Sequence, residues 1–115
     1  MADLIACFTT DEHHRHLHRV LNEAEWDRAF IVTTKELKQK HKFAKEVIYI
    51  VVDPKKPIGE YVEDIKSSLK GFFLETGVNI VNGTGKDHMA LLSAVMKAGL
   101  SFRLVAVTKN GVEEI

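Results

Sequence analysis

Short apolar runs alternate with helical patterns along this chain, and this alternation limits the possible folds more than any other feature. The predicted strands cover residues 4–8, 29–33, 47–52, 78–82 and 102–107. In the segments between them, apolar side chains recur at helical spacing. Strands that alternate with helices build a parallel sheet that is covered by helices on both faces. The sequence therefore predicts a Rossmann-like α/β sandwich of three layers, with a mostly parallel sheet of about five strands.

The C-terminal residues are expected to add one antiparallel strand at the edge of this sheet. Asn110 and Gly111 form a strong hairpin signal, after which residues 112–115 return along the preceding strand. The run at 47–52 is apolar on both faces, which is typical of a central strand covered on both sides. The chain has no repeat or linker, so residues 1–115 are predicted to form a single domain.

The predicted helices differ in how they begin and in how much they bury. The clearest pattern spans 58–72, where one face carries Ile58, Tyr61, Val62, Ile65, Leu69 and Phe72. The segment 35–45 has few apolar residues, so its helix, capped by Thr34, should be short or exposed. Thr9 and Glu12 have capping-box spacing and are expected to begin the first helix.

The helix predicted at 87–98 has a different character. It is apolar nearly all round, so we expect it to be buried or to lie at a subunit interface. Gly99 is its expected end.

Composition and charge exclude several classes of protein. Sixteen basic and sixteen acidic residues cancel, which argues against a dedicated duplex-DNA binder. The longest apolar run, 47–52, is far shorter than the roughly 20 residues of a membrane span. The N-terminus lacks the pattern of a signal peptide, so a cytoplasmic location is expected. The single cysteine, Cys7, excludes an internal disulfide and a multi-cysteine metal site, and we expect no cofactor.

The turn after the fourth predicted strand is the most informative part of the sequence. Ligands of open α/β sheets bind beyond the carboxyl ends of the strands. Residues 82–89 read Asn-Gly-Thr-Gly-Lys-Asp-His-Met, in which two glycines let a ligand approach the backbone. Thr84 offers a hydroxyl and Lys86 a positive charge. The segment is neither a Walker A loop nor a dinucleotide fingerprint. It fits a phosphate- or nucleotide-binding turn, and equally a plain strand-to-helix turn.

Residues 82–90, followed by an apolar helix, resemble the signature of CRISPR-associated Rossmann-fold (CARF) domains, where a strand ends in a Gly-Thr-x-Lys-like turn. Residues 4–11 resemble the first strand and threonine-containing turn of that family, and the terminal hairpin resembles its antiparallel sixth strand. The resemblance implies a nucleotide-sensing homodimer in CRISPR-linked antiviral signalling. Two copies would bind a cyclic oligoadenylate or a related nucleotide across their two-fold axis. By position, the resemblance implies ligand contacts from Thr9, Thr10, Gly83, Thr84, Gly85 and Lys86.

Three functions stay open at this point. Most members of the family continue into an effector domain, whereas this chain ends at Ile115, so we expect a stand-alone domain. Such a domain could sense or sequester the nucleotide. It could instead be a metal-independent ring nuclease, in which Lys86 stabilises charge on the scissile phosphate. It could also be an interaction subunit without a ligand, with the helix at 87–98 as its partner surface.

The densest cluster of titratable residues is formed by His13, His14, His16 and His18. On a helix, His14 and His18 share a face and could chelate a metal ion. A third ligand would have to come from Asp11, Glu12, His41 or His88. Because zinc sites need three or four fixed ligands, we favour a solvated helix start and expect no bound metal. An imidazole near the first turn could also bind phosphate or act as a general acid or base.

Other residues have two interpretations each. The basic stretch of Lys35, Lys38, Lys40, His41, Lys42 and Lys45 could contact nucleic acid, but Glu36 and Glu46 dilute it and favour a solvated face. Cys7 is expected to act as a small apolar side chain rather than as a nucleophile. Asp53 could be catalytic or a metal ligand, or could simply start a turn. Trp26 is expected to pack between the first helix and the sheet.

Overall fold

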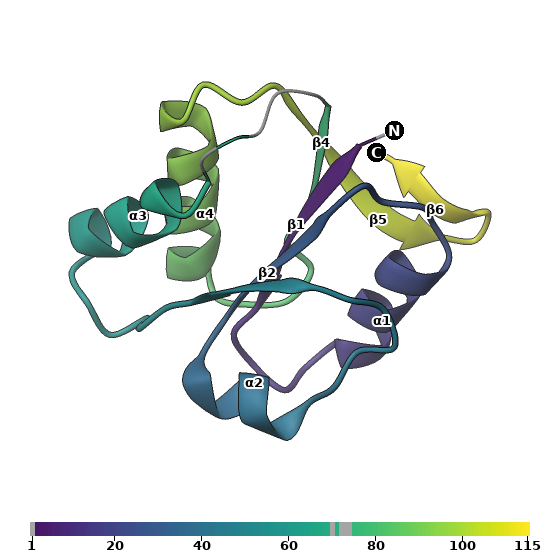
Figure 1. The fold of residues 1–115 in the computed structure, drawn as a ribbon, viewed down its shortest axis with the longest axis horizontal. Helices are drawn as coiled ribbons and strands as arrows, with labels where there is room; N and C mark the ends of the chain where they lie inside the picture. The colour runs from purple at the N-terminus through teal and green to yellow at the C-terminus, as the bar shows by residue number, and fades with distance from the viewer. Residues whose placement is uncertain (1, 70, 72–74) are drawn as a thin grey trace.

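In the computed structural model, residues 2–69, 71 and 75–115 are described, and they form six strands and four helices (Figure 1). The strands are β1 (Asp3–Phe8), β2 (Ala29–Thr33), β3 (Ile48–Val51), β4 (Thr76–Asn79), β5 (Phe102–Thr108) and β6 (Gly111–Glu114). The helices are α1 (His14–Asn22), α2 (Lys35–Lys40), α3 (Ile58–Ser67) and α4 (Gly85–Lys97). The predicted alternation of strand and helix is confirmed.

The sheet has the strand order β3-β2-β1-β4-β5-β6. Strands β1 to β5 are parallel, and β6 runs antiparallel to β5 at the edge. The chain moves outward from β1 through β2 to β3, and then crosses back to place β4 on the other side of β1. The order therefore reverses between β1 and β4, where doubly wound sheets place their ligands.

The sheet is covered on both faces. Helices α3 and α4 lie on one face, while α1 and α2 lie on the other (Figure 1). Alternate residues of β1 serve the two cores, because successive side chains of a strand point to opposite faces. Ile5 packs in the core under α3 and α4, and Leu4 in the core under α1 and α2. These are the three layers that the sequence predicts.

The apolar run at 47–52 does not form a central strand, and that prediction is wrong. Strand β3 stands at the end of the sheet order and pairs with β2. Ile48 and Val51 are 45% and 48% exposed, whereas Ile50 is buried. An apolar pattern indicates that side chains avoid water, but it does not indicate which strand has a neighbouring strand on each side. The direction of the crossover after β3 decides that.

The first helix begins later than its predicted cap. The N-terminal flank of α1 is His13, which has a left-handed φ of 57°, and not Thr9. The Thr9 hydroxyl is used elsewhere, as described below. Thr34 does cap α2, because its Oγ1 accepts from the N–H of Leu37 at 3.3 Å. Helix α2 ends at Lys40, so it is short, as predicted.

The second half of the chain agrees with the predictions in the type of its elements, although the boundaries of β4 and α4 differ from the predicted ones. Strand β4 spans Thr76–Asn79 rather than residues 78–82. Helix α4 spans Gly85–Lys97 rather than residues 87–98. Helix α4 buries Leu91 and Val95 but leaves Met89 and Met96 66% and 61% exposed. It is therefore buried on one face. Gly99, with a φ of 73°, follows its end.

Two smaller expectations can be followed in the same way. In α3, Tyr61, Val62 and Ile65 are buried, and Leu69 is buried just beyond the helix; Ile58 is 41% exposed, and Phe72 lies outside the described residues. The hairpin pairs Thr108 with Gly111, whose φ is 98°. The connecting residues are therefore Lys109 and Asn110, one position earlier than the Asn-Gly signal indicates.

Trp26 packs between α1 and the sheet, as predicted. Its Nε1 donates to the Val20 carbonyl at 2.9 Å. Its ring covers Gly77 so closely that a Cβ there would lie 3.0 Å from the indole. Gly77 is thus the position in β4 that makes room for the tryptophan.

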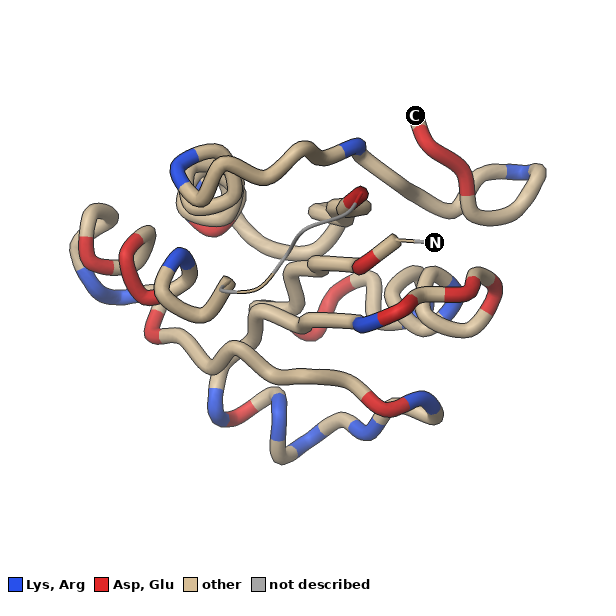
Figure 2. Tube along the Cα trace, turned by 45° about the horizontal axis from the view of Figure 1, so that its top comes forward, with Lys and Arg blue, Asp and Glu red and all other residues tan. Residues whose placement is uncertain are grey.

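The lysines of α2 and of the loop after it are mostly exposed. Blue segments dominate along α2 and the loop that follows it, with red segments only near the two ends of this stretch (Figure 2). Several lysines there contact the fold: Lys38 lies over the Tyr49 ring at 4.9 Å, and Lys40 pairs with Asp11 at 3.1 Å. The exposure of these lysines agrees with the interpretation of the basic stretch as a solvated face. Among the described helices, none is long and apolar enough to cross a membrane.

Candidate functional site

The reversal of strand order brings together the two loops for which the resemblance to CARF domains implies ligand contacts. Thr9 and Thr10 follow β1, and the segment 83–86 lies between β4 and α4. The two loops touch, because a Cβ on Gly83 would lie 3.0 Å from the Thr9 Oγ1. The φ of Gly83 is +110°, a backbone conformation that favours glycine. The structure therefore gathers all the predicted site residues at the carboxyl ends of β1 and β4.

Asn82 joins the two loops through its side-chain amide. Its Oδ1 accepts from the N–H groups of Thr9 and Thr10, at 2.8 and 3.2 Å. Its Nδ2 donates to the carbonyl oxygens of Thr10 and Glu12. Asn82 is 2% exposed, so these bonds replace water for the polar backbone of the β1–α1 loop. One side chain therefore holds the shape of the neighbouring loop.

Asp87 is the centre of a second network, in the first turn of α4. Its Oδ2 accepts from the Thr9 hydroxyl at 2.6 Å and from the Thr84 N–H at 2.9 Å. Its Oδ1 accepts from the Tyr61 hydroxyl of α3 at 2.6 Å. Thr84 also caps α4, since its Oγ1 accepts from the Asp87 N–H, which completes a capping box. The network ties β1, α3 and α4 together.

The Asp87 carboxylate is a buried negative charge that its hydrogen bonds stabilise. Burial would raise its pKa, but the bonds from Thr84, Thr9 and Tyr61 hold the pKa below its usual value. Burial and the neighbouring carboxylate raise the pKa of Tyr61, which stays a donor. The charge lies at the N-terminus of α4, where the helix dipole favours it. An anionic ligand would therefore be bound further out, away from Asp87.

Gly85 and Lys86 are the candidates for that outer position. Both are in the first turn of α4, and helix geometry leaves their N–H groups without an acceptor inside the helix. Apart from its chain neighbours and the backbone of α4 itself, no described atom lies within 4 Å of the place that a Cβ of Gly85 would take. The Lys86 ammonium donates to the Lys56 carbonyl at 2.6 Å, a bond that it could exchange for a phosphate.

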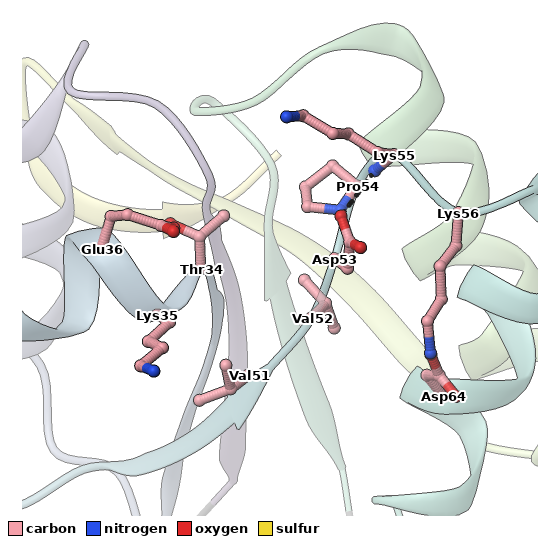
Figure 3. Close-up of a pocket in the computed structure, with 10 residues that line it drawn as sticks. All are labelled: Thr34, Lys35, Glu36, Val51, Val52, Asp53, Pro54, Lys55, Lys56 and Asp64. Carbon is pink, nitrogen blue, oxygen red and sulfur yellow. Dashed lines mark hydrogen bonds and ion pairs between the residues drawn. The ribbon is translucent and has the colours of Figure 1, made fainter.

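A wide pocket opens at the carboxyl ends of β2 and β3 (Figure 3). It encloses about 690 Å³ and is lined by Lys35, Lys55, Lys56, Asp53 and Asp64, among others. Lysine and carboxylate charges largely balance there, since the Lys56 ammonium pairs with Asp64 at 2.8 Å. The Oδ1 of Asp53 accepts from the Lys55 N–H at 3.0 Å. Asp53 therefore acts as the turn starter that one of its two interpretations predicts.

Cys7 lies inside β1, behind the Thr9–Asp87 contact. Its Sγ is 3.6 Å from the Thr9 Oγ1, and the residue is 1% exposed. Burial raises the pKa of the thiol to about 12, partly opposed by its hydrogen bonding with Thr9. The thiol is therefore protonated at neutral pH, which agrees with its interpretation as a small apolar side chain.

Cys7 is consequently expected to resist alkylation in the folded protein. A pKa of about 12 leaves roughly 1,000-fold less thiolate at pH 8 than an ordinary cysteine has. Iodoacetamide labelling, followed by mass spectrometry, should be at least that much slower in buffer than in concentrated urea. Equal labelling rates in the two solvents would show that the thiol is neither buried nor neutral.

Sequence reasoning missed the residues that organise this edge, namely Asn82, Asp87 and Tyr61. A signal for Asp87 was present, because Thr84 and Asp87 have the capping-box spacing that the prediction assigned to Thr9 and Glu12. Tyr61 gave no such signal, since a tyrosine on an apolar helix face indicates only burial. Among the described residues, no three histidine, cysteine or acidic side chains are placed to hold a metal ion as they stand.

The fold and this edge define a doubly wound α/β protein with a candidate ligand site where the strand order reverses. The chain matches no protein-family model, and no curated protein is significantly similar to it. The resemblance to CARF domains thus rests on the segments 4–11 and 82–90 and on the terminal hairpin.

Proposed function

We propose that this protein binds a nucleotide, with a cyclic oligoadenylate as the ligand, at the carboxyl ends of β1 and β4. The observation that carries the proposal is the start of α4. The helix has 13 residues, and the open space at Gly85 makes its N-terminus accessible. Lys86 adds a positive charge there. The threonine loop after β1 lies alongside, at the point where the strand order reverses.

The chemistry of this edge suits a phosphodiester. The N–H groups of Gly85 and Lys86, which have no acceptor inside the helix, and the dipole of α4 favour an anion. The Lys86 ammonium would neutralise one phosphate charge. Thr10 is half-buried, and among the described residues its Oγ1 accepts a single long hydrogen bond, from the Glu12 N–H at 3.4 Å. Its hydroxyl is therefore better placed for a ligand than that of Thr9. The Thr9 hydroxyl donates to Asp87 and lies 3.6 Å from the Cys7 Sγ, so both contacts hold it within the protein.

The proposal includes a homodimer, as the resemblance implies. Met89 and Met96 form an exposed apolar face on α4, and Val81, Leu104 and Ile115 are exposed apolar residues elsewhere. Exposed apolar side chains of this size favour contact with another protein surface. A second copy would bring a second α4 N-terminus to the same ligand.

Binding is tested by equilibrium titration and melting temperature with cyclic tetra- and hexa-adenylate in EDTA, with AMP and ATP for comparison. We expect a higher melting temperature and one ring per two chains. Lys86→Ala should weaken binding by about tenfold or more, because it removes a charge-assisted phosphate contact. Lys97→Ala, at the exposed other end of α4, is the matched control and should bind as the wild type does.

The same experiment separates the alternatives. A linear product that forms in EDTA and is lost in Lys86→Ala would identify a ring nuclease. No response to any nucleotide, together with a stable complex with another protein, would favour the interaction subunit. Equal affinities of the wild type and Lys86→Ala would contradict the proposed position of the phosphate.

A further inference from the structure

We propose that the pocket at the carboxyl ends of β2 and β3 (Figure 3) binds the ribose and base of a nucleotide whose phosphate lies at Lys86. This assignment rests on the proposed function and adds a second position for the same ligand. The pocket encloses about 690 Å³. That volume is within the range of about 300 to 1,000 Å³ that is typical of sites for small organic ligands.

The pocket and the phosphate position share one residue, Lys56. Its backbone carbonyl accepts from the Lys86 ammonium at 2.6 Å, and the same residue lines the pocket. The Lys56 ammonium is paired with Asp64 of α3 at 2.8 Å, so these two charges satisfy each other. A phosphate that takes the place of the Lys56 carbonyl at Lys86 would therefore lie beside the pocket wall, with its sugar directed into the pocket.

Two cations and two carboxylates in the pocket remain for a ligand. Lys35 and Glu36, at the start of α2, stand on one side, and Asp53 and Lys55 stand on the other (Figure 3). Among the described residues, the charged groups of Lys35, Glu36 and Lys55 have no ion pair or hydrogen bond. The Oδ1 of Asp53 accepts from the Lys55 N–H at 3.0 Å, which leaves its Oδ2 for a ligand donor.

These groups match the donors and charges of a ribonucleotide. The 2′-hydroxyl of a ribose can donate to the Oδ2 of Asp53, in the way that an acidic side chain holds the ribose in dinucleotide-binding folds. The ammonium groups of Lys35 and Lys55 suit further phosphates of a cyclic oligonucleotide. Inorganic phosphate would leave the carboxylates without a donor, and a neutral sugar would leave the lysines without an anion.

Apolar side chains give the pocket a surface on which a base can lie. Val51, the last residue of β3, is 48% exposed and lies between the two charged sides (Figure 3). Val52 and Pro54 continue this surface into the loop after β3. A base that covers these side chains removes apolar area from water, which stabilises the bound state. The pocket therefore favours a nucleoside over a bare phosphate.

The test is calorimetric titration of the full chain with AMP and 2′-deoxy-AMP, which differ only in the hydroxyl assigned to Asp53. We expect the wild type to bind AMP about tenfold more tightly than 2′-deoxy-AMP. Asp53→Asn should bind AMP about tenfold more weakly than the wild type does, and should bind the two nucleotides equally. Asparagine keeps the turn, because its Oδ1 can accept from the Lys55 N–H, but its NH₂ group then faces the ligand.

Glu63→Gln is the matched control, because Glu63 is an exposed carboxyl of α3 that does not line the pocket. Both substitutions remove one negative charge, which by itself favours an anionic ligand. Glu63→Gln should therefore bind AMP as tightly as the wild type or slightly more tightly. Weaker binding by Asp53→Asn alone would identify a direct contact. Ribose 5-phosphate should bind at least about tenfold more weakly than AMP, because it lacks the base.

Cyclic tetra-adenylate distinguishes failure of this assignment from failure of the proposed function. If the ring binds and Lys86→Ala weakens it, but Asp53→Asn and Glu63→Gln bind it equally, the phosphate position stands and the pocket assignment is overturned. Equal affinities of the wild type for AMP and 2′-deoxy-AMP would overturn the Asp53 contact in the same way. If no nucleotide binds, both proposals fail. Melting curves without ligand show that each variant is folded.

Discussion

Replacing Asp87 with alanine is expected to lower the free energy of unfolding by about 3 to 4 kcal/mol, the largest effect of any substitution near the site. The change leaves the buried Tyr61 hydroxyl and the Thr9 hydroxyl without their shared acceptor. It also removes the reciprocal half of the capping box on α4. For a domain of this size, the melting temperature should fall by on the order of 10 °C.

Asp87→Asn separates charge from shape. The amide has nearly the same volume, but its NH₂ group would face hydroxyl or N–H donors, so we expect a loss of about 2 kcal/mol. Asp64→Asn is the matched control, because Asp64 makes a partly exposed ion pair with Lys56. Such pairs contribute about 0 to 1 kcal/mol. Equal losses in the two variants, measured by urea unfolding, would show that the Asp87 network does not stabilise the fold.

The pH dependence gives the same network a second readout. The pKa of Asp87 is lower in the folded protein than the ordinary value of about 3.9 in the unfolded chain. Its contribution is therefore fully present above about pH 4 and is lost as the pH falls through the folded-state pKa. The stability difference between the wild type and Asp87→Asn should be largest at neutral pH and smaller near pH 3. A difference that is constant with pH would show that Asp87 is not charged.

Gly83→Ala is expected to destabilise the protein by about 2 to 4 kcal/mol, through strain and overpacking together. The backbone has a φ of +110°, which side chains other than glycine rarely adopt. The added Cβ would also lie 2.8 Å from the Cys7 Sγ and 3.0 Å from the Thr9 Oγ1. The substitution would therefore push Thr9 away from Asp87 as well as straining the turn.

Gly59→Ala is the control for this substitution. The space that its Cβ would fill in α3 is open among the described residues, and its φ is not positive. Alanine there should be neutral or stabilising by up to about 1 kcal/mol. The double variant Cys7→Ala with Gly83→Ala should be less destabilised than the sum of the two single variants, because Cys7 is the nearest atom to the new Cβ. Additive losses would show that crowding against Cys7 contributes nothing to the cost.

The location of the candidate site could be predicted from the sequence, but the hydrogen-bond partners within it could not. Glycines, threonines and a lysine after a strand indicate a polar turn at the carboxyl edge, and the structure places 83–86 there. The partner of each polar group is a matter of distance in space. Thr9 is separated from Asp87 by 78 positions, and their 2.6 Å bond exists only because β1 and β4 are neighbours.

The same reasoning explains the misplaced strand and the histidines. The run at 47–52 is apolar, but its place at the edge depends on the return of the chain across the sheet. His14 and His18 are paired by helix periodicity, whereas His41 joins them through the packing of the loop after α2. Local pattern carries information about one element at a time.

The sequence by itself determined the class of fold, the type and order of the elements, and the caps at Thr34 and Gly99. These depend on periodicity and on backbone preference, which act over a few residues. The tertiary structure alone decided the order of the strands, the Asp87 network and the meeting of His41 with α1. Those depend on which distant segments are packed together, because hydrogen bonds and ring contacts form only at short range and in fixed directions.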